Sequence, residues 1–176
     1  MKTYVMIPTY NERENIGNLI QEILNLKISD LRIVVVDDNS PDGTSVVVKD
    51  LSREHQEVEL LLRTTERGRG SAGIAGFKHA LEHGADCIIE MDADFSHHPK
   101  YIPSMLAAIQ NADMVIGSRF ISGGEDVNRG IMRKVITILA GIYVRVLLGL
   151  KIKDVSSGYR CFKRKVLEAI ELDSMI

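Results

Sequence analysis

Two hydrophobic patterns alternate along the 176-residue chain. Short, continuous apolar runs rich in β-branched residues predict strands that are buried on both faces of a parallel sheet. These runs occupy residues 3–7, 31–36, 58–62, 87–91 and 114–116. Between them, apolar residues recur at the spacing of one helical face, as in Ile16, Leu19, Ile20 and Ile23. This alternation predicts βαβ units, and therefore an α/β fold with a doubly wound, mostly parallel sheet.

Turn and capping residues set the expected ends of these elements. Pro8 is expected to end the first strand, and Pro41-Asp42-Gly43 is typical of a turn. Thr44 is expected to cap the helix that follows this turn. Further helices are predicted over residues 71–83, 103–110, 132–148 and 164–170, with another strand at 157–162.

Length and composition indicate one globular domain over residues 1–176, because 45% of residues are apolar and 26% are charged. A net charge of -2 gives no general argument for nucleic-acid binding. Cys87 and Cys161 lack CxxC spacing, and Cys87 lies in an apolar run, so we interpret it as a buried reduced thiol. A cytoplasmic location is therefore expected.

Residues 135–150 form the most apolar stretch of the chain. A helix that spans a bilayer needs about 20 apolar residues, and this stretch is shorter. It predicts a buried or membrane-facing amphipathic helix rather than a transmembrane span.

An acidic pair, Asp92 and Asp94, follows the predicted buried strand at 87–91. Side chains two positions apart on a strand point the same way, and like charges held that close raise each other's pKa unless a cation lies between them. Carboxylate oxygens are ligands for Mg²⁺ or Mn²⁺ rather than for zinc. The pair therefore indicates a metal site, with a solvated acidic turn as the alternative.

Polar residues also follow the other predicted strands, where ligands of doubly wound sheets bind. Asp37 and Asp38 can accept a hydrogen bond from a base or a ribose hydroxyl, or can instead cap the turn at 39–43. Arg119 can clamp a phosphate with its bidentate fork, unless it is an ordinary surface arginine. Arg133, at a predicted helix start, can contribute to an anion site, with a solvated first turn as the alternative.

Residues 68–73 match the GxGxxG pattern of dinucleotide-binding folds. That pattern requires its glycines directly after a strand, and here five polar residues, 63–67, intervene. We therefore interpret the segment as a loop that enters a helix, with Arg67 and Arg69 solvated or near a phosphate.

Five motifs together resemble family 2 glycosyltransferases, and among them the dolichyl- or polyprenyl-phosphate mannose synthases. They occur in the family's order and span nearly the whole chain. The motifs are Pro8-Thr9-Tyr10-Asn11-Glu12, the run from Val36 to Thr44, the run from Asp92 to Pro99, Gly117-Ser118-Arg119 and Ser157-Gly158-Tyr159-Arg160.

The resemblance implies a GT-A fold, a nucleotide-sugar donor and a divalent cation, Mg²⁺ or Mn²⁺. Asp94 would bind the metal, together with Ser96, which replaces a glutamine ligand of some members with a weaker hydroxyl ligand. The implied catalytic residues are Asp92, Asp94, Arg119 and Arg133. The implied donor-binding residues are Pro8, Tyr10, Glu12, Val36, Asp38, Asp92, Ala93, Asp94 and Arg119.

The resemblance also implies a reaction: inverting transfer of mannose from GDP-mannose to a dolichyl or polyprenyl phosphate, at the cytoplasmic face of a membrane. Two alternatives stay open, namely transfer from another nucleotide sugar such as UDP-glucose or to a soluble or polysaccharide acceptor, and a non-catalytic nucleotide-binding module. Family members continue beyond the motif at 157–160, so we expect a C-terminal segment of the family to be missing from this sequence. No oligomeric state is predicted.

Overall fold

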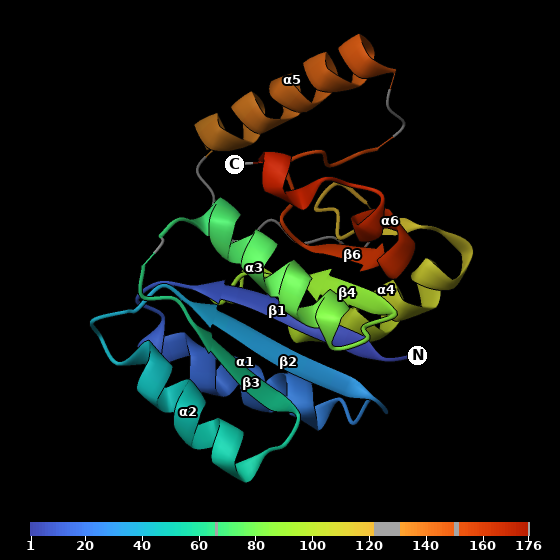
Figure 1. Ribbon diagram of the computed structural model, residues 1–176. Helices are drawn as coiled ribbons and strands as arrows, with labels where there is room; N and C mark the ends of the chain where they lie inside the picture. Colours follow the sequence, from blue (N-terminus) through green and yellow to red (C-terminus); the bar gives the residue numbers. More distant parts are fainter. Residues whose placement is uncertain (66, 122–130, 150–151, 176) are drawn as a thin grey trace.

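A six-stranded sheet forms the centre of the computed structural model, which describes residues 1–65, 67–121, 131–149 and 152–175 (Figure 1). The strand order is β3-β2-β1-β4-β6-β5. The strands are β1 (Thr3–Thr9), β2 (Leu31–Asp37), β3 (Val58–Leu62), β4 (Cys87–Glu90), β5 (Met114–Ile116) and β6 (Arg160–Lys163). The helices are α1 (Arg13–Asn25), α2 (Thr44–Glu54), α3 (Arg69–Glu82), α4 (Ile102–Ala108), α5 (Ile131–Leu148) and α6 (Arg164–Glu168).

The sheet is mostly parallel, as the alternating pattern predicts. β1 pairs in parallel with β2 and with β4, and β2 pairs in parallel with β3. β6 lies between β4 and β5 and is antiparallel to both. Because β1, β2, β3 and β4 run in one direction, their carboxyl ends lie at one edge of the molecule, at the left of Figure 1.

Two hydrophobic clusters cover the two faces of the sheet. On one face, Val5 and Ile7 of β1 pack with Ile16 and Ile20 of α1 and with Ile102 of α4. The cluster on the other face joins Met6 and Val36 to helix α3 and to the C-terminal segment, through Ala72, Ile74, Ala80, Leu167 and Leu172. Figure 1 shows α1 and α2 below the sheet and α3 and α6 above it. Both faces of the central strands are therefore buried, which explains their continuous apolar runs.

Two predicted boundaries are wrong. Pro8 does not end β1, because it lies within the strand opposite Val36 and the strand continues to Thr9. Thr44 does not cap α2 with its own side chain: the Thr44 N–H donates to Asp42 Oδ1 at 2.9 Å. Asp42 also accepts from the Arg13 N–H at 3.0 Å, so one carboxylate satisfies donors at the start of both α1 and α2.

The apolar stretch at 135–150 forms most of helix α5, which lies apart from the sheet at the top of Figure 1. A buried helix was one of the two expectations, and the exposure of α5 shows that it is wrong. Met132, Tyr143 and Val146 are 74%, 68% and 80% exposed, and Ile136, Leu139, Leu147 and Leu148 are also exposed. Among the described residues, no helix is long and apolar enough to span a bilayer.

The two cysteines are buried and unoxidised, as expected for Cys87 from its apolar run. Cys87 lies on β4 and Cys161 on β6, with 3.1 Å between their Sγ atoms. They contribute to the packing between these two antiparallel strands.

Gly76 allows α3 to lie directly on the sheet. A Cβ added at Gly76 would lie 2.4 Å from Met6 Cγ and 2.9 Å from Val36 Cγ2. We predict that Gly76→Ala lowers the free energy of unfolding by about 1–3 kcal/mol through overpacking, as measured by denaturant titration. Gly141→Ala is the matched control, because a Cβ there meets open space on α5 and alanine favours helix. Equal stability of the two variants would contradict this packing.

Candidate active site

The carboxyl ends of β1 and β2 are held together by Asp37. This carboxylate is fully buried and accepts hydrogen bonds from Thr9 Oγ1 at 2.9 Å, from the Ser40 N–H at 2.9 Å and from Ser40 Oγ at 2.6 Å. Ser40 Oγ in turn accepts from the Asn11 N–H at 3.0 Å. Of the two alternatives for Asp37, the structure therefore favours capping of the turn at 39–43. The Asp37 carboxylate holds the loops at the site, and neither of its oxygens is directed to solvent.

Asp38 points the other way, toward the loop that follows β3. Its Oδ1 lies 3.0 Å from Nη1 of Arg63, and its Oδ2 accepts from the Gly68 N–H at 2.7 Å. Both side chains of this ion pair are buried. Arg63 also donates from Nη2 to Ser71 Oγ at 2.7 Å. Asp38 and Arg63 thus join the end of β2 to the start of α3.

Three carboxylates of β4 and the loop after it act electrostatically on Arg69: Glu90, Asp92 and Asp94. Arg69, the first residue of α3, donates a hydrogen bond from Nη2 to Asp92 Oδ1. Its Nη1 lies 3.7 Å from Glu90 Oε1. Burial raises the pKa of Glu90, although Arg69 and Arg160 act in the opposite direction. Arg69 thus pairs with the acidic residues while its side chain stays 56% exposed, and its expected place near a phosphate stays a prediction.

Asp94 is the exposed one of these three carboxylates. Burial alone would raise its pKa, but hydrogen bonds from the Ser96 side chain and from the Ser96 N–H, the latter at 3.0 Å, outweigh burial and lower that pKa. Phe95 adopts a left-handed conformation, with φ of 61°, which is uncommon for a bulky residue. This turn brings Ser96 back onto Asp94, so the carboxylate is held ionised and accessible.

His97 lies beside the acidic pair and is held by main-chain contacts. Its Nδ1 accepts from the Asp92 N–H at 2.9 Å, so Nδ1 carries no proton, and its separation of 3.5 Å from Asp92 Oδ2 is not a hydrogen bond. Burial lowers the pKa of His97 despite the neighbouring carboxylates. The ring stacks on Tyr159 with centroids 5.0 Å apart. His97 is therefore a neutral ring that positions the Asp92 main chain.

Arg119 binds a carboxylate of this chain. Its Nε and Nη2 donate to Oδ2 and Oδ1 of Asp154 at 2.8 and 2.9 Å, and Nη2 also lies 2.8 Å from Ser156 Oγ. Asp154 is 1% exposed. The bidentate fork predicted for a phosphate is thus occupied by Asp154 in this state, and a role for Arg119 toward a phosphate stays a prediction.

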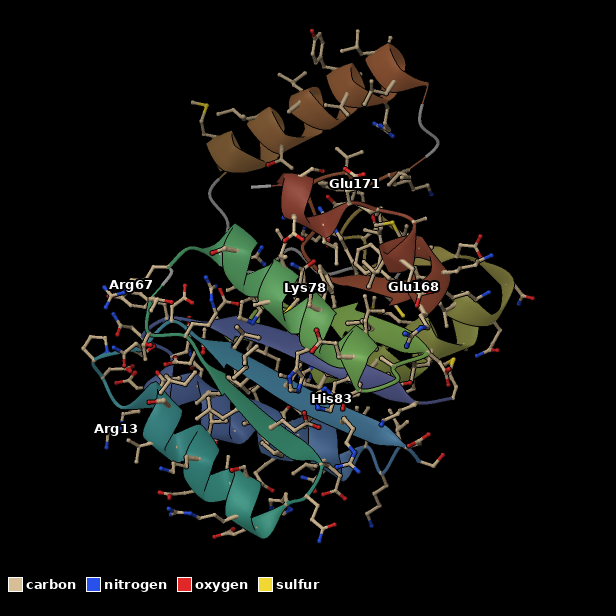
Figure 2. The ribbon with its side chains drawn as sticks, in the orientation of Figure 1. Arg13, Arg67, Lys78, His83, Glu168 and Glu171 are labelled. Atoms are coloured by element: carbon tan, nitrogen blue, oxygen red, sulfur yellow. The ribbon has the colours of Figure 1, made fainter. Side chains whose placement is uncertain are left out.

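The other predicted donor residues differ in how they are placed. Tyr10 is half exposed at the end of β1, and the Arg67 guanidinium lies 5.8 Å from the centre of its ring. Figure 2 shows Arg67 and Arg13 at this same end of the molecule. Glu12 accepts from Asn15 Nδ2 at 2.9 Å.

Val36 and Ala93 are buried, and Val36 packs under α3, so it can reach a donor only through its main chain. Pro8 is partly exposed near the end of β1. Arg133 belongs to the first turn of α5, but its side chain lies outside the described residues.

Sequence reasoning did not single out Arg63 or Asp154, and it named Arg69 and Gly158 without the partners that the structure gives them. A Cβ added at Gly158 would lie 3.1 Å from Arg69 Nη2 and 3.2 Å from His97 Cε1, so a larger residue there would require these side chains to shift. A basic residue at a helix start, where the dipole favours anions, was a usable signal for Arg69. The other three pairings join residues far apart in the sequence, and no local pattern marks them.

The fold and the site place this chain in a known class of proteins. The family model for glycosyl transferase family 2 matches residues 4–171. The chain belongs to this family, and its sheet and helices have the GT-A arrangement that the resemblance implied.

Curated relatives agree with this assignment. The chain is 42% identical over 175 residues to an undecaprenyl-phosphate mannosyltransferase of Micrococcus luteus, covering 99% of this chain and 72% of the relative. It is 40% identical to a polyprenol monophosphomannose synthase of Mycolicibacterium smegmatis, with 99% and 66% covered. It is 42% identical to a dolichol-phosphate mannosyltransferase of Pyrococcus furiosus, with 98% and 49% covered.

Solved structures share the fold at low sequence identity. A mannosyltransferase from Pyrobaculum calidifontis, solved with GDP-mannose and Mn²⁺, has a TM-score of 0.63 at 21% identity and covers 97% of this chain and 46% of that one. The mannosyl-3-phosphoglycerate synthase of Rubrobacter xylanophilus has a TM-score of 0.69 at 20% identity, with 94% and 54% covered.

The Arg119–Asp154 pair leads to a prediction about pH. Burial raises the pKa of Asp154, but hydrogen bonds from Arg119 outweigh it and lower that pKa below its usual range. A carboxyl group with a depressed pKa stabilises the fold above its unfolded-state pKa and loses this contribution as the pH falls. We therefore predict that Asp154→Asn lowers the free energy of unfolding by about 1–3 kcal/mol at pH 7 and by much less near pH 3.

Denaturant titration at the two pH values measures this difference. Asp50→Asn is the control, because Asp50 forms an exposed pair with Arg53 and such pairs contribute little. A loss of stability for Asp154→Asn that does not shrink at low pH would show that the ion pair is not its cause.

Proposed function

We propose that this chain carries the catalytic domain of a glycosyltransferase that moves a mannosyl group from GDP-mannose to the phosphate of a polyprenyl or dolichyl lipid. In the reaction, an oxygen of the lipid phosphate forms a bond to the sugar C1, while the bond from C1 to the diphosphate breaks with inversion and GDP leaves. The names of the three relatives at 40–42% identity support this choice of sugar and acceptor. The observation that most directly supports this proposal is the exposed, ionised carboxylate of Asp94 in the loop after β4.

The donor set at this site fits Mg²⁺ or Mn²⁺. Asp94 offers ionised carboxylate oxygens, and the Ser96 hydroxyl lies beside it. In the described part of the chain, no group of three or more His, Cys, Asp or Glu residues is placed so that it could hold a metal ion, so the protein would supply few ligands. A metal with few protein ligands completes its shell with water and substrate phosphates. When bound, the ion would neutralise the charge that develops on the departing diphosphate.

The chain's own residues would hold the nucleotide at the carboxyl ends of β1 and β2. Tyr10 offers an exposed ring edge, and Glu12 a partly exposed carboxylate, beside the loop that carries Arg67. Asp38 already accepts one N–H and faces Arg63, but a carboxylate has about four acceptor sites, so it can also accept from the base or a ribose hydroxyl. Asp92 and Ala93, between the acidic strand and Asp94, would contact the sugar and the diphosphate.

The acceptor requires little activation from the protein. A phosphate monoester is an anion at neutral pH, so no strong general base is needed to form the nucleophile. This agrees with a neutral His97 that is engaged with the main chain. The task left to the enzyme is to bring two anions together, for which Arg119 and Arg133 are the proposed cationic groups.

Helix α5 is the proposed contact with the lipid. Its exposed apolar side chains, among them Ile136, Leu139 and Tyr143, suit a prenyl chain or the surface of a bilayer. Because Arg133 lies in the first turn of the same helix, we assign it to the acceptor phosphate.

We predict that GDP-mannose binding depends on a divalent cation and on Asp94. Calorimetry should show the affinity for GDP-mannose falling at least about tenfold when Mn²⁺ is removed with EDTA, and by a similar factor in Asp94→Asn with Mn²⁺ present. Asp50→Asn removes the same charge on α2 and should bind as the wild type does. The same titration with UDP-glucose tests the alternative donor, and tighter binding of UDP-glucose would sink the assignment to GDP-mannose.

We predict that Arg133→Ala reduces transfer to a polyprenyl phosphate by at least about tenfold and leaves the affinity for GDP-mannose unchanged, because only the acceptor loses a charged partner. Arg145→Ala, at the other end of α5, is the matched control and should transfer normally. Lysine at position 133 should recover part of the rate, since it keeps the charge without the fork. Transfer that is unaffected by Arg133→Ala, or donor affinity that falls equally, would remove Arg133 from the acceptor site. Hydrolysis of GDP-mannose without transfer to any lipid would contradict the proposed acceptor.

A further inference from the structure

Arg69 is placed where helix electrostatics disfavour it. It is the first residue of α3, and the positive end of the helix dipole repels a cation there. Nevertheless, its guanidinium folds back over the acidic residues, donating to Asp92 Oδ1 and approaching Glu90 Oε1 at 3.7 Å. The carboxylates therefore determine where this side chain lies.

Three separate segments surround the Arg69 guanidinium. β4 supplies Glu90, the loop after it supplies Asp92, and the loop before β6 approaches so closely that a Cβ at Gly158 would lie 3.1 Å from Arg69 Nη2. Burial acts to lower the pKa of Arg69, but Asp92, Glu90 and Asp94 together raise it. The side chain is nevertheless 56% exposed, so it can leave without unpacking the core.

This arrangement puts Arg69 in competition with any second cation. While Asp92 Oδ1 accepts from Arg69, that oxygen is not available to a metal, and the positive charge beside Asp94 repels one. A donor diphosphate changes this balance, because a phosphate offers the guanidinium an alternative bidentate partner. The carboxylates of Asp92 and Glu90 would then be available to the metal.

We propose that Arg69 is a positioning residue that couples metal binding to donor binding: it holds Asp92 and Glu90 when the donor is absent, weakens metal binding in that state, and moves to the diphosphate when the donor enters. The inference rests on the proposed donor and metal sites. The Arg69 guanidinium is then the cation that the metal replaces on the acidic residues when the donor binds. Metal and nucleotide consequently bind with positive cooperativity.

The test measures Mn²⁺ binding by electron paramagnetic resonance, with and without GDP, in the wild type and in Arg69→Met, which keeps an unbranched, flexible side chain and removes its charge. We expect Arg69→Met to bind Mn²⁺ alone about tenfold more tightly than the wild type, and to gain less Mn²⁺ affinity on addition of GDP. The Mn²⁺–GDP complex that forms in solution is common to both proteins and cancels in the comparison.

Arg67→Met is the matched control, because Arg67 precedes α3 in the same loop and lies over the Tyr10 ring rather than on the acids. It should leave the binding of Mn²⁺ alone unchanged. Arg69→Lys should give an intermediate gain, since lysine keeps the charge but not the fork. It also provides the test if Arg69→Met does not fold.

Two outcomes separate this inference from the proposed function. If the wild type binds Mn²⁺ with GDP but Arg69→Met binds Mn²⁺ alone no more tightly than the wild type, the role of Arg69 is refuted and the metal site stands. If Arg67→Met raises the affinity for Mn²⁺ alone as much as Arg69→Met does, the effect comes from the loss of any positive charge nearby. The role of Arg69 is then also refuted. If the wild type does not bind Mn²⁺ even with GDP, the metal site and the inference fail together.

Discussion

Repulsion among three neighbouring carboxylates is the constraint on which this site depends. Glu90, Asp92 and Asp94 alternate with buried residues of β4 and the loop after it, and all three carboxylates act electrostatically on Arg69. Such a group is stable only with a compensating cation or with raised pKa values. The protein uses several means: burial raises the pKa of Glu90, Arg69 neutralises Asp92, and hydrogen bonds from Ser96 keep Asp94 ionised at the rim. One carboxylate is thereby left ready for a further cation.

The loops around these carboxylates are held in place by contacts within the chain. Asp37 accepts hydrogen bonds from both Thr9 and Ser40. Asp42 accepts from N–H groups at the start of both α1 and α2. These two carboxylates therefore hold the loops after β1 and β2. The loop before β6 comes close to Arg69 at Gly158, where a larger residue would require a shift. Hydrogen bonds within the chain therefore fix the loops on the donor side of the site.

Sequence patterns predicted the parts of this molecule that depend on local order. The strand runs, the helical periodicity and the acidic pair are all local, and they led to the mostly parallel sheet and to the carboxyl ends of its strands. The reversed direction of β6, the capping of α2 by Asp42 and the Arg119–Asp154 pair were not predicted, because each depends on contacts made only after the chain folds. Arg119 shows the difference most clearly. The sequence singled this residue out as a phosphate clamp, which stays a prediction, but its partner in the structure is Asp154, 35 positions away in the sequence.

We propose that the carboxylates after β4 receive a metal-bound sugar nucleotide. A crystal structure with GDP-mannose and Mn²⁺, with anomalous scattering used to locate the manganese, tests this most directly. We expect a manganese ion held by an Asp94 oxygen beside the donor diphosphate, with the guanine near Tyr10 and Asp38. A donor bound elsewhere, or a manganese ion with no Asp94 ligand, would contradict it.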